Sequence, residues 1–109
     1  MHISDMAIEA FNNSERKGFH KGADNQNIPT KLALIHAEVS EALEDHRRGK
    51  IDTFVNVDGK PTGFAQELAD IVIRVGDLAE MTGVDLEKEI IFKMKYNSTR
   101  EIMHGGKKY

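Results

Sequence analysis

Two acidic pairs, each with a spacing of three residues, constrain the fold of this chain more than any other feature of its sequence. The first pair is Glu38 and Glu41, and the second is Glu67 and Asp70. On an α-helix, residues three apart project from the same face, one turn above the other. The spacing therefore predicts two helices, and it allows the two carboxylates of each pair to contact the same ion.

The apolar residues around both pairs follow the helical period. They are Leu34, Ile35, Val39, Ala42 and Leu43 around the first pair, and Phe64, Leu68, Ile71, Val75 and Leu78 around the second. We expect these two stripes to face the core, with the carboxylates within them or at their edges. An ionised carboxylate removed from water is costly unless it is paired or bound to a cation. A divalent cation would offset this cost and the repulsion between the pairs.

The donor atoms predict which cation would bind. All four side chains offer oxygen, and the chain has no cysteine, so a hard ion such as Mg²⁺ or Mn²⁺ suits them better than zinc. An ordinary solvated acidic surface is the alternative, since acidic pairs at helical spacing are common. Two pairs on consecutive helices, both beside an apolar stripe, favour the metal site.

A later helix carries a polar stripe. Asp85 is a suitable N-cap for a helix predicted over 86–103. Four side chains on it follow the spacing i, i+3, i+4, i+7: Lys93, Tyr96, Asn97 and Arg100. The guanidinium group of Arg can contact two phosphate oxygens at once, and the ammonium group of Lys adds a point charge, so these residues suit a polyphosphate. A solvated helix face is the alternative.

The remaining sequence predicts two further features. Ser4 is a candidate N-cap for a first helix that runs to about Lys17, and residues 19–28 read as a loop. Residues 49–63 contain β-branched side chains and the turn signal Asp58-Gly59, which predicts a short hairpin or an ordered loop.

The next helix is predicted over 64–82, ending at Gly83. We therefore expect an all-α fold in which the two acidic helices pack antiparallel with their carboxylates facing each other.

Glu38-Val-Ser-Glu41 followed by Glu67-Leu-Ala-Asp70 resembles the signature of the MazG-like all-α nucleoside triphosphate pyrophosphohydrolases, which is Glu-Glu-x-x-Glu and then Glu-x-x-Asp. The resemblance implies a MazG-like helical bundle in which these four carboxylates hold Mg²⁺. The chain departs from the signature at Ala37, where the family commonly has a glutamate. This departure bears on the number of ions bound, because the four ligands themselves are intact.

The C-terminal part carries the same resemblance. Lys-x-x-Tyr-Asn-x-x-Arg, which begins at Lys93, is followed by His104-Gly-Gly-Lys-Lys, as in small MazG-like enzymes. The resemblance implies that Lys93, Tyr96, Asn97 and Arg100 contact the nucleotide. The backbone at Gly105-Gly106 is a further candidate for phosphate contact.

The resemblance also implies the reaction, in which water attacks the α-phosphate of a nucleoside triphosphate and the products are a monophosphate and pyrophosphate. Either Glu38 or Glu41 is the candidate general base, with Glu38 favoured by its apolar neighbours. A phosphoribosyl-ATP pyrophosphohydrolase is one alternative. A non-catalytic helical oligomer that binds a metal or a nucleotide is another.

Composition excludes other function classes. The formal net charge of −3 and the absence of a basic stripe argue against a nucleic-acid-binding protein. No apolar run approaches the length of a membrane span, and the first residues lack the pattern of a signal peptide, so a cytoplasmic location is expected. The 109 residues predict a single domain, residues 1–109. The resemblance implies a homodimer or homotetramer.

Overall fold

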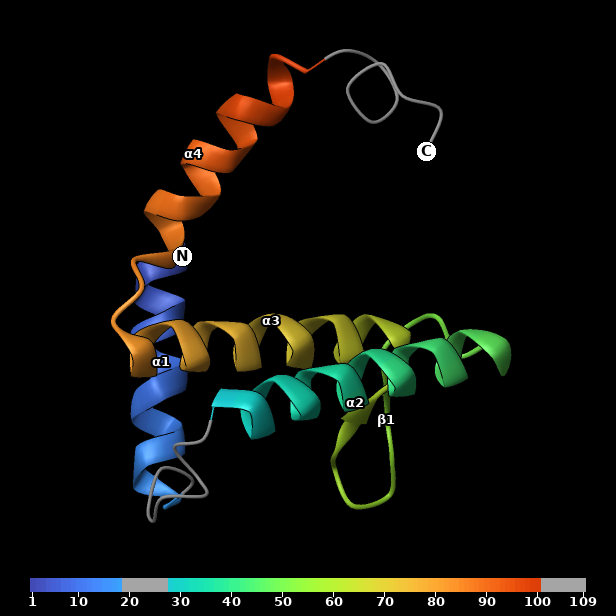
Figure 1. The fold of residues 1–109 in the computed structure, drawn as a ribbon. Coiled ribbons are helices and arrows are strands. Elements are labelled where there is room, and N and C mark those ends of the chain that lie inside the picture. Colours follow the sequence, from blue (N-terminus) through green and yellow to red (C-terminus); the bar gives the residue numbers. More distant parts are fainter. Residues whose placement is uncertain (19–27, 101–109) are drawn as a thin grey trace.

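The computed structural model describes residues 1–18 and 28–100, and within these ranges the chain is mostly helical (Figure 1). The elements are α1 (Ile3–Arg16), α2 (Ile28–Arg47), β1 (Phe54–Val55), β2 (Pro61–Thr62), α3 (Phe64–Thr82) and α4 (Leu86–Ser98). The predicted all-α class is confirmed. The two short strands pair antiparallel between α2 and α3, where the sequence predicted a hairpin or an ordered loop.

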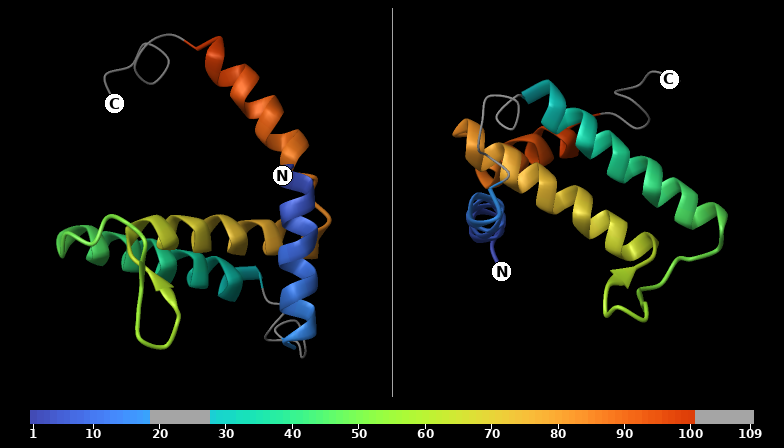
Figure 2. Two further views of the ribbon diagram at one scale, coloured as in Figure 1. Left: turned by 180° about the vertical axis from the view of Figure 1, so that it is seen from behind. Right: turned by 90° about the horizontal axis from the view of Figure 1, so that it is seen from below.

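Helices α2 and α3 lie side by side and run antiparallel, and the hairpin segment joins them at one end of the pair (Figures 1 and 2). Helix α1 runs across α3 near the other end of the pair. Helix α4 begins beside the first residues of α1 and extends away from the α2–α3 pair (Figure 1). The predicted antiparallel packing of the two acidic helices is therefore present. Helix α4 lies apart from most of the α2–α3 pair (Figure 1).

Local signals fixed two helix ends as predicted. Helix α3 ends at Gly83, which has a φ of +77° and whose N–H donates to the carbonyl oxygens of Ala79 and Glu80. A left-handed residue that ends a helix in this way is usually glycine. Helix α4 begins after Asp85, whose carboxylate accepts a hydrogen bond from the backbone N–H of Lys88 at 3.2 Å.

The predicted start of the first helix was wrong. Helix α1 begins at Ile3, and its N-cap residue is His2, which makes no side-chain capping bond. The backbone N–H of Ser4 donates instead to a carboxylate oxygen of Glu87 on α4, at 3.3 Å. An acceptor from a distant segment therefore does the work that the Ser4 hydroxyl was expected to do.

The predicted end of the last helix was also wrong, since α4 stops at Ser98 rather than continuing to residue 103. The hydroxyl of Ser98 donates to the carbonyl oxygen of Lys95, and that of Thr99 to the carbonyl oxygen of Tyr96, both at 2.7 Å. Serine and threonine hydroxyls compete in this way with the backbone bonds that extend a helix.

Small residues form the buried contact between α1 and α3. Ala7, Ala10 and Ala79 are all at most 9% exposed. Gly76 on α3 is also buried, and a Cβ atom placed there would lie 2.8 Å from the Met6 sulfur and 3.2 Å from the Ala7 Cα. The helices approach this closely because Gly76 has no side chain, which leaves room for the Met6 side chain and the backbone of α1.

Much of the two apolar stripes is exposed, contrary to the prediction that they face the core. Val39 is 49% exposed, Leu43 51% and Leu68 47%. Ile71 and Val75 are half-buried. A pair of adjacent helices crossed by a third has too few layers to cover both faces. Within the described ranges, no helix has the combination of length and apolar character that crossing a bilayer requires.

Candidate metal centre

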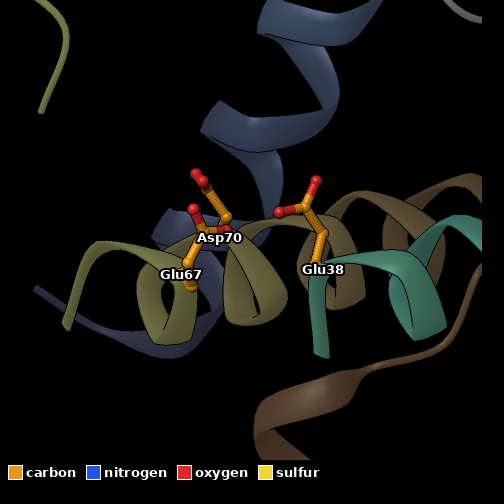
Figure 3. Close-up of side chains that lie close together, drawn as sticks. All are labelled: Glu38, Glu67 and Asp70. Carbon is orange, nitrogen blue, oxygen red and sulfur yellow. The ribbon is translucent and has the colours of Figure 1, made fainter. Parts of the chain in front are cut away.

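Three of the predicted carboxylates converge between the two acidic helices. Glu38 projects from α2, and Glu67 and Asp70 project from successive turns of α3 (Figure 3). One oxygen from each of the three lies within 4.8 Å of the other two. The spacing of three residues places Glu67 and Asp70 on one face of α3, and the antiparallel packing brings Glu38 opposite them. Because their oxygens lie this close together, one cation could contact all three carboxylates.

The fourth predicted ligand, Glu41, lines the same cavity but lies outside this closest group. It lies near enough to Glu67 for its charge to raise the pKa of Glu67. The structure therefore brings all four predicted carboxylates to one cavity and three of them to a distance at which a single ion could be shared.

The protonation of Glu67 reflects this crowding. The pKa of Glu67 is raised to about 7, first by burial and then by hydrogen bonding with Glu38 and Glu41 and by their negative charges. Those hydrogen bonds need a proton on one of the carboxyl groups. When all are ionised, the Oε2 atom of Glu67 is buried without a hydrogen-bond partner among the described residues. A bound cation would satisfy this atom as a proton does.

Asp70 is under opposing influences. Burial raises its pKa, as does the charge of Glu38, whereas the charges of Arg74 and Lys60 lower it. The two cationic side chains come from different elements, Arg74 from α3 and Lys60 from the loop between β1 and β2. The carboxylate of Asp70 therefore has both positive side chains and a like-charged carboxylate near it.

These side chains line one cavity of about 420 Å³, which is within the usual range for small-ligand sites. Besides the four carboxylates, the lining includes Lys17 at the end of α1, Lys60 and Arg74. Helices α1, α2 and α3 and the hairpin segment all contribute to it. The cavity thus combines oxygen ligands for a cation with positive side chains that could contact an anion.

Two polar contacts hold the walls of the cavity together. The Nε atom of Arg74 donates to Oε1 of Glu38 at 2.9 Å, which joins α3 to α2. The hydroxyl of Ser14 donates to Oδ2 of Asp77 at 3.0 Å, which joins α1 to α3. Both contacts involve residues that line the cavity.

The predicted nucleotide-binding residues of the last helix lie elsewhere. Tyr96 is flanked by Lys93, whose Nζ atom is 5.5 Å from the ring centroid, and by Arg100, whose Cζ atom is 5.9 Å from it. Lys93, Tyr96 and Asn97 are on α4, but Arg100 follows the helix end, so the prediction that all four lie on one helix was wrong. None of the four is among the described residues that line the cavity.

Sequence reasoning missed several cavity residues. Arg74 follows Asp70 by four residues, so its place on the same helical face was a usable signal. Asp77, seven residues after Asp70, had the same signal. Lys60 and Ser14 carried none, because chain segments distant in sequence bring them to the cavity. The phosphate contact predicted at Gly105-Gly106 falls outside the described residues, as does most of the loop predicted over 19–28.

Comparisons with known proteins gave no match, whether against models of protein families, curated protein sequences or solved structures.

Proposed function

We propose that this chain is a cytoplasmic, MazG-like nucleoside triphosphate pyrophosphohydrolase that depends on Mg²⁺ and releases a nucleoside monophosphate and pyrophosphate. The observation that carries the proposal is the convergence of Glu38, Glu67 and Asp70, with their oxygens within 4.8 Å of one another. The Oε2 atom of Glu67 in the same cluster, which is buried without a partner among the described residues when the carboxyl groups are ionised, also supports it.

The donor atoms fit a hard divalent cation. Glu38, Glu67 and Asp70 would hold the ion, and Glu41, which lines the same cavity, is available as a further ligand or as a base. Carboxylate oxygens suit Mg²⁺ and Mn²⁺, and Mg²⁺ typically keeps several waters that substrate phosphates can replace. A bound cation would neutralise charge on the phosphates and lower the pKa of a nearby water.

The protein's own residues divide the remaining tasks. Glu38 is engaged by Arg74 and belongs to the three-carboxylate group. Glu41 lies beside that group, so it is the better placed of the two candidate bases to accept a proton from water. The water oxygen forms a bond to the α-phosphorus, and the bond from that phosphorus to the bridging oxygen breaks. Pyrophosphate leaves with the electron pair, and Glu41 passes the proton to solvent.

Positive side chains around the cavity would bind the outer phosphates. Lys17, Lys60 and Arg74 come from three separate elements and surround the carboxylates. Charge-assisted contacts to phosphate oxygens are stronger than neutral hydrogen bonds. Within one chain, phosphate contacts would therefore come from these three residues, since Lys93 and Arg100 are not among the described residues that line the cavity.

We also propose that the chain forms a homo-oligomer. Phe92 on α4 is 71% exposed, Met94 65% and Ile91 56%. A second copy packed on this apolar surface would cover it. It would also offer a route by which the polar side chains of α4 reach the cavity of a neighbouring copy.

Product analysis tests the proposed reaction. The purified protein would be incubated with canonical, deoxy and modified nucleoside triphosphates and with phosphoribosyl-ATP, each with Mg²⁺, with Mn²⁺ and with a chelator. We expect monophosphate and pyrophosphate to form from at least one nucleoside triphosphate, and only with a divalent cation. Turnover of phosphoribosyl-ATP alone would assign the alternative substrate. Nucleotide binding without turnover of any compound would contradict an enzymatic role.

A further inference from the structure

The ion pair between Arg74 and Glu38 occupies a carboxylate that the proposed metal centre needs. The Nε–Oε1 distance is 2.9 Å, and the side chain of Glu38 is only 12% exposed while that of Arg74 is 44% exposed. Glu38 is thus held in place by its surroundings, whereas the guanidinium group reaches solvent and has room to move. A cation that binds Glu38 at this oxygen must compete with Arg74 for it.

The charges that line the cavity indicate what Arg74 would bind after such an exchange. Its described lining contains five carboxylates and three cationic side chains, an excess of two negative charges when all are ionised. One divalent cation offsets that excess, and by binding Glu38 it would release the guanidinium group of Arg74 from its ion pair. A triphosphate then supplies new anionic oxygens in the same cavity, and the fork of a guanidinium group matches two of them.

We propose that Arg74 is the counter-ion of Glu38 in the metal-free protein and transfers to a substrate phosphate when the cation and the triphosphate bind together. The proposal rests on the proposed function. Arg74 competes with the cation alone but assists the cation–triphosphate complex, so each of the two ligands binds more tightly when the other is present. Binding free energies make this coupling reciprocal.

A static ion pair that only joins α2 to α3 makes a different prediction. In that case, removal of Arg74 would shift the affinities for the cation and for the triphosphate only through the loss of one positive charge, and Arg74→Lys, which keeps that charge, would restore both. The chain offers a matched control for such a structural pair. Arg48, the first residue after α2, contacts Glu44 of α2 at 3.1 Å. Both side chains are exposed, and neither is among the described residues that line the cavity.

Manganese binding tests the proposal without relying on catalysis. Wild type, Arg74→Met, Arg74→Lys and Arg48→Met would be titrated with Mn²⁺ while free Mn²⁺ is measured by electron paramagnetic resonance, without and with a non-hydrolysable α,β-methylene triphosphate. We expect Arg74→Met to bind Mn²⁺ alone about tenfold more tightly and the analogue with Mn²⁺ about tenfold more weakly, as loss of one charge-assisted contact implies. Arg48→Met should match wild type.

Arg74→Lys keeps the charge but lacks the fork, so we expect it to bind Mn²⁺ alone as wild type does and the analogue more weakly. It also serves if Arg74→Met does not fold. Unchanged or weaker Mn²⁺ binding in Arg74→Met would overturn the proposal, as would an Arg74→Lys protein that binds the analogue as tightly as wild type does. If neither wild type nor Arg74→Met bound Mn²⁺, the metal centre would fail as well. Opposed shifts in a protein without hydrolytic activity would support the exchange and contradict only the proposed reaction.

Discussion

Replacement of Glu67 by Gln should stabilise the metal-free protein at alkaline pH. The pKa of Glu67 is about 7 in the folded protein, compared with an ordinary value of 4.5. The folded state therefore holds this proton more tightly than the unfolded chain does. The resulting stability is fully present below the unfolded pKa and is lost as the pH rises through the folded pKa. Glutamine keeps the shape of the side chain and removes the charge.

The two pKa values set the magnitude. Each unit of pKa corresponds to about 1.4 kcal/mol, so the difference gives a ceiling of about 3 kcal/mol. Glu67 is only half-buried, and screening by water reduces our expectation to about 1–2 kcal/mol. Wild type should lose this amount between about pH 5 and pH 8.5, while Glu67→Gln should not.

Urea unfolding at about pH 5 and about pH 8.5, followed by circular dichroism, measures the effect. A chelator is present, and all proteins are at equal concentration. Glu80→Gln is the control, because Glu80 is an exposed carboxylate on the same helix. It should change the free energy of unfolding little at either pH. Addition of Mg²⁺ at the higher pH should stabilise wild type and not Glu67→Gln. A Glu67→Gln protein less stable than wild type at the higher pH, or equally changed at both pH values, would refute the reasoning.

Three other changes test separate parts of the account. Asp70→Asn should lower metal-dependent hydrolysis by at least about 100-fold while unfolding in urea stays cooperative, and near-normal turnover would exclude this residue from the site. Gly76→Val should lower the free energy of unfolding by about 1–3 kcal/mol, because its side chain must displace Met6, whereas Ala69→Val at an exposed position of α3 should cost less. Phe92→Asp should reduce the molar mass measured by light scattering after gel filtration, and an unchanged mass would remove α4 from the proposed interface.

Features whose chemistry is local were predictable from the sequence. The Asp85 carboxylate caps the helix that follows it, and Gly83 takes the left-handed conformation that ends α3. In the predicted turn, Gly59 has a φ of +81°. The convergence of the acidic pairs was also predictable, because helical spacing fixes the face and consecutive helices usually pack beside each other.

Features that depend on contacts between distant segments were not predictable. Ser4 has the residue type of an N-cap, yet its N–H bonds to Glu87, which lies 83 positions away in sequence. The direction of α4 depends on the turn after α3 and on packing against α1, so a polar stripe on that helix could not reveal where it points. The same limit applies to Lys60, which reaches the cavity only through the course of the hairpin.

The position of a bound cation tests the central claim most directly. A crystal of the protein soaked in Mn²⁺, measured near the manganese absorption edge, would locate the ion from its anomalous scattering. We expect a peak within coordination distance of carboxylate oxygens from Glu38, Glu67 and Asp70. If these side chains kept their present arrangement and the map showed no peak between them at a saturating Mn²⁺ concentration, the proposed metal centre would be contradicted.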